Sequence, residues 1–295
     1  MLQRCGLSCL DALRRHERAA RAGDDEAIHQ MRVAMRRLRA GLSSFSPFLS
    51  VEARRSVSDQ LRWPADVLGQ ARNLDVFATE FLTSARSPLR DSSEFARLTL
   101  AMDRRRELAH AAVRRAIGSP RYRASVKAVR RWFDRSEWRS NPMAGDLSLP
   151  IDRLAPVMLE RHFRKARKLG RGFDRQSDEQ RHRLRIALKK LRYATELFGD
   201  IYDTNEVKTF VGCLKWLQDE LGKANDLAVA REIMTDLTGH CVKRTGVALA
   251  GARLLDRRQR RLASNEPALR QHLTRLFEIE RFWPRPYSQA VAMYG

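Results

Sequence analysis

The chain repeats part of itself at a fixed offset. HQMRVAMRRLR, from His29 to Arg39, and HRLRIALKKLR, from His182 to Arg192, lie 153 positions apart and share five identical residues. The same offset aligns LRWPADVLGQARNL from Leu61 with LKWLQDELGKANDL from Leu214, where seven of fourteen residues are identical. Because chance does not place two such blocks at one offset, the sequence indicates an internal duplication.

The duplication divides the chain into two similar halves. We place a single domain over residues 1–285, with a first half at 1–140 and a second half at 150–285. The stretch between the halves contains proline and glycine, which are typical of linkers. Apolar residues recur at spacings of three and four without sustained alternation, and this pattern predicts an all-α fold of antiparallel helices. The helices are expected at residues 3–21, 25–46, 51–84, 93–117, 121–135, 151–169, 177–199, 204–235, 242–263 and 266–281.

Cations form a stripe on the helix of each repeated segment. At 100 degrees per residue, one face of the first helix is apolar, and a second face about 120 degrees away carries the basic residues. No carboxylate lies between Gln30 and Glu52 or between Arg183 and Ala194. We therefore expect the stripe to have no partner on its own helix. The apolar face holds Ile28, Met31, Met35, Leu38, Leu42 and Phe45. The first stripe consists of His29, Arg32, Arg36 and Arg39, and the second consists of His182, Arg185, Lys189 and Arg192. Arg37 in the first copy and Lys190 in the second point in a third direction around the helix axis.

The overall charge agrees with a polyanionic ligand. The chain has 57 Lys and Arg against 35 Asp and Glu, which gives a net charge of +22, and 48 of the 57 cations are arginine. A guanidinium group binds two phosphate oxygens at once, and so much charge repels itself unless a polyanion is near. An ordinary solvated surface remains the alternative, with acids supplied by other helices, such as Glu17, Asp66, Asp75, Asp219 or Asp226.

Further basic positions are kept in both copies. A solvated face needs only to stay polar, so conserved positions of charge within one chain favour a binding role. Because these residues come from other predicted helices, they are secondary candidates for the same surface. They are Arg14 with Arg167, Arg18 with Arg171, Arg104 with Arg257, and Arg105 with Arg258.

The two repeated helices, IHQMRVAMRRLRAGLSSF and RHRLRIALKKLRYATELF, each precede an L-[RK]-W helix, and together they resemble the CHAD domain, the conserved histidine α-helical domain. The resemblance extends from about residue 3 to Trp283. It implies two pseudo-symmetric antiparallel four-helix bundles, whereas the periodicity predicts five helices in each half. It also implies a shared basic groove that binds inorganic polyphosphate. The groove residues that it implies are His29, Arg32, Arg36, Arg37, Arg39, His182, Arg185, Lys189, Lys190 and Arg192.

Other classes of function remain to be separated from polyphosphate binding. Non-specific binding of DNA or RNA would use the same charge, although aromatic residues, which stack on bases, are only 7% of the chain. An enzyme is not expected, because the E-x-E-x-K strand of the triphosphate-tunnel (CYTH) domain, which precedes many family members, is not evident. No cofactor or metal is expected either, since an arginine one turn from each histidine disfavours a metal cation.

The remaining expectations concern the cysteines and the location of the protein. Cys5, Cys9, Cys213 and Cys241 lack the paired spacing of a zinc site, so we expect buried free thiols. No apolar stretch approaches the length of a membrane span, and the first residues do not have the apolar core of a secretion signal. We therefore expect a cytoplasmic protein without a membrane partner, associated with polyphosphate granules.

Overall fold

All regular elements of the described residues, 1–85, 89–137, 150–239 and 244–286, are helical. In this computed structural model, the first half forms α1 (Leu2–Ala22), α2 (Asp25–Ser44), α3 (Val51–Val76), α4 (Ser93–Gly118) and α5 (Pro120–Asp134). The second half forms α6 (Ile151–Gly170), α7 (Asp178–Phe198), α8 (Thr204–Gly239) and α9 (Arg244–Glu278). The predicted all-α class is confirmed.

The two repeated helices, α2 and α7, begin with different caps. The Asp24 carboxylate accepts hydrogen bonds from the backbone N–H groups of Glu26 and Ala27, at 2.8 and 3.1 Å, and so caps the start of α2. Helix α7 starts at Asp178, and its cap is the preceding residue, Ser177. There the Ser177 hydroxyl accepts from the N–H of Gln180, whose side-chain oxygen accepts from the N–H of Ser177. This reciprocal pair satisfies two donors at once, so Ser177 takes the cap position.

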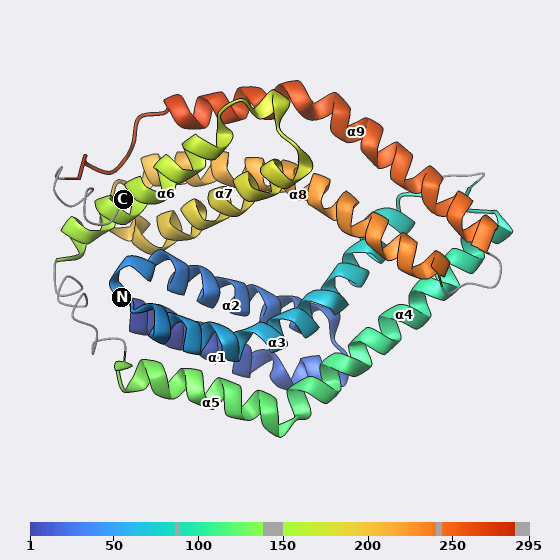
Figure 1. Cartoon of the computed structure of the whole chain (residues 1–295), viewed down its shortest axis with the longest axis horizontal. Coiled ribbons are helices and arrows are strands. Elements are labelled where there is room, and N and C mark those ends of the chain that lie inside the picture. Colours follow the sequence, from blue (N-terminus) through green and yellow to red (C-terminus); the bar gives the residue numbers. More distant parts are fainter. Residues whose placement is uncertain (86–88, 138–149, 240–243, 287–295) are drawn as a thin grey trace.

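The second half has one helix fewer than the sequence predicts. The break expected between the predicted helices 242–263 and 266–281 does not form, and α9 continues through Pro267. Proline removes one hydrogen bond from a helix, but the buried Leu269, Leu273 and Leu276 hold the segment on the core. In the first half the chain does break, at Ser119, whose hydroxyl caps α5. Helices α4 and α5 together therefore follow one edge of the molecule, as α9 alone follows the other (Figure 1).

The halves pack against each other through α2 and α7, which lie side by side at the centre of the molecule (Figure 1). Each repeated helix also packs on its two sequence neighbours, α1 and α3 for α2, and α6 and α8 for α7. At the far end, α4 packs on α9, and the end of α3 continues as a π-helix, Phe77–Leu82. The repeated helices are thus flanked by other helices, and this arrangement determines what faces their cations.

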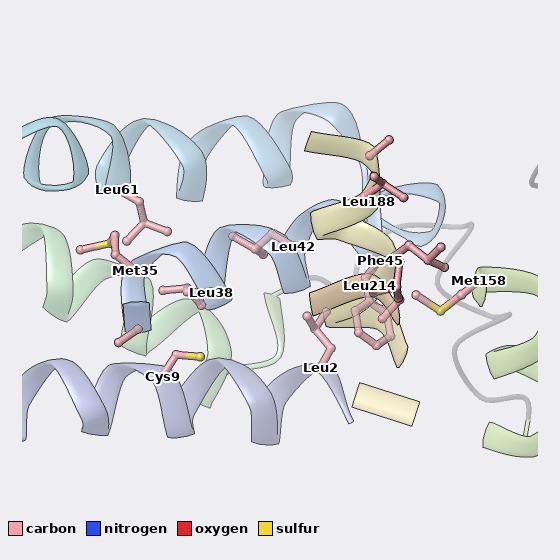
Figure 2. Packing of buried hydrophobic residues seen from close by; sticks show 14 of the residues in the cluster. Leu2, Cys9, Met35, Leu38, Leu42, Phe45, Leu61, Met158, Leu188 and Leu214 are labelled. Carbon is pink, nitrogen blue, oxygen red and sulfur yellow. The ribbon is translucent and has the colours of Figure 1, made fainter. Parts of the chain in front are cut away.

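One hydrophobic cluster runs through both halves. Phe45 and Phe198, which are equivalent at offset 153, meet edge to face with ring centroids 6.2 Å apart. Figure 2 shows Leu42 and Phe45 of the first half beside Leu188 and Leu214 of the second. A shared core fixes α2 relative to α7, because buried side chains pack at close to crystal density. The duplication itself remains an interpretation of the sequence.

Candidate functional site: a basic groove between α2, α3 and α7

The apolar face of α2 is buried as predicted, and its burial turns the basic stripe toward α3 and α7. Ile28, Met31 and Met35 are each at most 1% exposed. The stripe lies about a third of a turn away from these residues, so it faces the space beside the neighbouring helices. The periodicity of the sequence therefore decides the direction in which the cations point.

A cavity of about 900 Å³ lies between α2, α3 and α7, and we call it the groove. Helix α2 contributes Arg32, Arg36 and Arg39 to its lining, and α7 contributes Lys189 and Lys190. Helix α3 adds three cations and two carboxylates, so the described lining is strongly positive. These residues from α3 are Arg54, Arg55, Arg62, Asp59 and Asp66.

The amine of Lys189 lies at the centre of the groove's positive charge. Burial, followed by the charges of Arg185, Arg36, Arg32 and Arg39, lowers the pKa of Lys189 to about 8. Four arginines from two helices are therefore close enough to disfavour one more charge. The group that would relieve this repulsion is an anion bound in the groove.

Arg32 is held on the wall of α3 by two hydrogen bonds. Its guanidinium donates to the backbone oxygen of Gly69 at 3.2 Å and to the side-chain oxygen of Asn73 at 3.0 Å. Burial, followed by the charges of Arg36 and Arg72, lowers the pKa of Arg32 to about 10. At pH 7 Arg32 is thus charged and oriented, and among the described residues no carboxylate is its hydrogen-bond partner, which leaves its charge available for a ligand.

Arg36 is held by a residue of the opposite half. Its Nε donates to the hydroxyl of Tyr193 at 2.6 Å, across the contact between α2 and α7. The position equivalent to Tyr193 in the first half is Ala40, so this bond occurs in one copy only. The tyrosine orients the guanidinium without neutralising it.

Lys190 extends the basic region toward α6. Burial, followed by the charges of Lys165, Arg161 and Arg54, lowers the pKa of Lys190. Burial and the charge of Arg54 also lower the pKa of Arg161. Cations from α3, α6 and α7 therefore converge at this end of the groove.

Several of these cations could not be predicted from the repeat. Arg54 corresponds to Val207 at offset 153, and Arg161 corresponds to Ser8. A search for cations kept in both copies discards such residues, because each occurs in one half only. Arg54 was detectable only as part of the high overall charge.

Arg185 lies against an acid supplied by α8. Burial raises the pKa of Asp226, while the charge of Arg185 opposes that shift. Burial likewise lowers the pKa of Arg185, and Asp226 opposes it. Asp226 is one of the acids considered above as partners for a solvated face, and it offsets part of the charge at this end of the stripe.

Arg37 and Arg192 are not among the described residues that line the groove, and neither is Arg185. Arg37 is exposed and lines a different cavity, beside α1. Arg192 lies 3.7 Å from Glu196, one turn along α7, and its guanidinium lies over the ring of Tyr193. The expectation that the stripe has no partner on its own helix is therefore wrong for Arg192, because Glu196 lies four residues after Arg192, beyond the end of the repeated segment.

The two histidines of the repeat differ in their surroundings, and neither is among the residues that line the groove. His29 is partly buried, with Nδ1 unpartnered among the described residues. Burial, followed by the charge of Arg72, lowers the pKa of His29. His182 is exposed, and its Nδ1 lies 2.9 Å from the side-chain oxygen of Asn225. Arg72 and Asn225 are equivalent at offset 153, so the same position carries a charge in one copy and an amide in the other.

The secondary candidates are not among the described groove residues. Arg105 forms an ion pair with Asp236 at 2.8 Å, and Arg258 lies 3.5 Å from Glu80. Arg257 donates to the backbone oxygen of Ser84 at 3.0 Å, which gives it a role in holding α9 to the end of α3. The remaining candidates are exposed on α1, α4 and α6 and just after α6, and they are Arg14, Arg18, Arg104, Arg167 and Arg171.

One cluster away from the groove has the composition of a metal site. Ligand atoms of Asp25, Asp75 and His110 lie within 4.8 Å of one another. Arg106 already donates to both carboxylates, at 2.9 Å to Asp25 and 3.1 Å to Asp75. A metal ion would have to share this space with a guanidinium group, so the cluster fits an internal ion-pair network better.

Comparisons with known proteins agree with this architecture. The family model of the CHAD domain matches residues 5–235. The crystal structure of the CHAD domain from the plant Ricinus communis is 25% identical, with a TM-score of 0.81, over 96% of this chain and 93% of that one. PptA from Streptomyces chartreusis is 19% identical, with a TM-score of 0.65, over 92% of this chain and 96% of that one, and it shares the fold.

A curated relative is longer than this chain. The uncharacterized protein Rv2226 of Mycobacterium tuberculosis is 28% identical over 227 residues, which are 73% of this chain and 41% of that protein. The chain thus matches about two fifths of the length of this relative. None of the described helices combines the length and the apolar character required of a membrane span.

Proposed function

Because this chain belongs to the CHAD domain family, we propose that it binds inorganic polyphosphate in the groove between α2, α3 and α7. The family is associated with polyphosphate binding in general. The observation that carries the proposal is the position of Lys189 in the groove lining, where the charges of four arginines lower its pKa. A chain of phosphates would supply the missing negative charge along the whole groove.

The aromatic residues favour polyphosphate over nucleic acid as the ligand. Trp132 and Trp283 are buried, Trp216 is stacked on His272, and Trp63 is covered by Arg121. Single-stranded nucleic acids bind proteins largely through bases stacked on exposed aromatic rings. Each of these indoles is already in contact with protein, whereas phosphate groups need only the cations.

We propose binding without catalysis. The groove acid Asp59 is paired with Arg62 at 2.8 Å, and the cations that line the groove fit a role in holding phosphates. An assay of phosphate release from polyphosphate checks this part of the proposal, and the expected rate equals that of buffer alone. Association with polyphosphate granules in the cytoplasm would follow from binding, and fluorescence microscopy of the tagged protein checks it.

A binding titration tests the main proposal. Fluorescent polyphosphate is bound and then competed with unlabelled polyphosphate, DNA or heparin at equal anionic charge, at two salt concentrations. For six to eight phosphate contacts we expect the logarithm of affinity to fall with the logarithm of salt with a slope of about −4 to −6. If DNA or heparin competes as well as polyphosphate, the groove is a general polyanion site and the proposed ligand is wrong.

The matched variants test whether binding takes place in the groove. Arg36→Glu with Lys189→Glu reverses two groove charges and should lower affinity at least tenfold and flatten the salt slope. Arg15→Glu with Lys215→Glu changes the net charge by the same amount at exposed positions outside the groove lining. Equal losses in both double variants would show that net charge, and not the groove, binds the ligand.

A further inference from the structure

A second cavity, of about 510 Å³, lies on the other side of α2, between α1, α2 and α7. We call it the thiol cavity, because Cys5 and Cys9 of α1 both line it. Arg37 and Ser44 of α2 line it as well. The sequence predicts ordinary core thiols here, whereas the structure leaves Cys5 only half-buried, at the edge of an open cavity.

The two sulfur atoms have different surroundings. Cys5 and Cys9 are one helical turn apart on α1, so their side chains lie on the same face of that helix. Cys9 is 7% exposed. A Cβ atom added at Gly41 would lie 3.7 Å from the Cys5 sulfur, so the backbone of α2 approaches that sulfur closely. Cys5 therefore lies between Cys9 on its own helix and the backbone of α2.

The electrostatics separate the pair into a thiolate and a thiol. The hydrogen bond from Cys9, against the effect of burial and with help from Arg37, lowers the pKa of Cys5 to about 7. The hydrogen bond to Cys5, followed by burial, raises the pKa of Cys9. Near neutral pH, Cys5 is the nucleophile of the pair. The charged groups that line the cavity are the amino group of Met1, Arg4, Arg37, Glu196 and Asp200.

An unpartnered hydroxyl group also lines the thiol cavity. Ser44 is 2% exposed, and its Oγ has no hydrogen-bond partner among the described residues. A buried hydroxyl normally finds a partner, because leaving it unpaired costs about 1–3 kcal/mol. A small polar molecule in the cavity would provide that partner near the cysteine pair.

We propose that Cys5 is a modification site that reacts with hydroperoxides, and that Cys9, Arg37 and Ser44 form its polar surroundings. The Cys5 sulfur attacks one peroxide oxygen, so that an S–O bond forms and the O–O bond breaks. The leaving oxygen takes a proton from water and departs as water or an alcohol. Sulfur is thereby oxidised by two electrons to a sulfenic acid, and the peroxide is reduced. This site is independent of polyphosphate binding.

The helix disfavours a disulfide as the final product. Side chains four residues apart on a helix have Cβ atoms about 5–6 Å apart, whereas a disulfide needs about 3.8 Å. Closing the bond would require the first turns of α1 to unwind. Cys9 therefore serves as a hydrogen-bond donor to the reactive sulfur, and the sulfenic acid persists long enough to be trapped.

The test compares cysteines within one molecule. The full chain with Cys241→Ser is treated with iodoacetamide at pH 7, and the alkylation of each cysteine is followed by peptide mass mapping. Cys213 is the internal control, since burial raises its pKa. We expect Cys5 to react at least about tenfold faster than Cys213. Equal rates, or faster reaction of Cys213, would overturn the proposal.

A variant and a trapping experiment complete the test. Cys9→Ala removes the donor and should shift the midpoint of the pH profile of Cys5 alkylation upward, which a purely structural role of Cys9 would not do. After one equivalent of hydrogen peroxide, dimedone should add a single adduct at Cys5. An adduct at Cys9, or a Cys5–Cys9 disulfide in place of the adduct, would overturn the assigned roles.

Discussion

Replacing Lys189 with methionine should stabilise the protein in the absence of a ligand. Burial and the surrounding arginines lower the pKa of Lys189 from 10.5 to about 8, so the folded state disfavours its charge. A lowering of this size corresponds to about 3 kcal/mol, and to about 2 kcal/mol once solvent screening at the partly buried amine is allowed for. Lys189→Met removes the charge while keeping a side chain of similar length.

The size of this effect can be measured by thermal unfolding. About 2 kcal/mol corresponds to a rise in Tm of about 4 °C for a chain of this size. The assay is differential scanning calorimetry at pH 7 and low ionic strength, because salt would screen the repulsion. The control is Lys215→Met, an exposed lysine of α8, which should change Tm by less than about 1 °C.

The pH dependence provides a second check of the same reasoning. Between the folded and unfolded pKa values of Lys189, the unfolded chain binds more protons, so the stability of the unmodified protein rises with pH. The repulsion is therefore fully present below pH 8 and is relieved as the pH rises toward 10.5. The advantage of Lys189→Met should shrink strongly by pH 9.5. An unchanged or lowered Tm at pH 7, or an equal gain at both pH values, would refute the account of the groove as a repulsive cluster.

Three further predictions concern the groove and the core. Tyr193→Phe removes the hydroxyl that accepts from Arg36, so the affinity for polyphosphate should fall about fivefold while the salt slope stays unchanged. Isothermal titration calorimetry measures this, and an unaltered affinity would contradict the orienting role of Tyr193. Glu160→Gln should destabilise the fold by about 3 kcal/mol in urea denaturation, because the buried carboxylate accepts from Arg281 and Trp283. Hydrogen bonds lower the pKa of Glu160 despite burial, so its contribution is present above the unfolded pKa and is lost as the pH falls through the folded value. Polyphosphate affinity should rise from pH 8 to 6, because a bound polyanion opposes the charge of Arg72 that helps to lower the pKa of His29. The double variant His29→Ala with His182→Ala should flatten that rise, and an unchanged rise would remove the histidines from the site.

The sequence determined the helices and the faces they bury. All six residues predicted for the apolar face of the first repeated helix are buried, because a helical period of 3.6 fixes which residues share a face. It also predicted Arg32, Arg36, Arg39 and Lys189, which line the groove, since these positions carry cations in both copies. The turn expected near Pro267 was wrong, because a local signal was overridden by the packing of the helix on the core.

Only the tertiary structure decided which cations share a space. Arg37 and Arg36 are adjacent in sequence but face different cavities, while Arg54 and Arg161 approach Lys190 from other helices. The contact between Tyr193 and Arg36 spans 157 residues, and the repeat contains no trace of it. Periodicity fixes the direction of a side chain relative to its own helix. What it meets there depends on how the two halves pack around their shared core, which is a property of the whole chain.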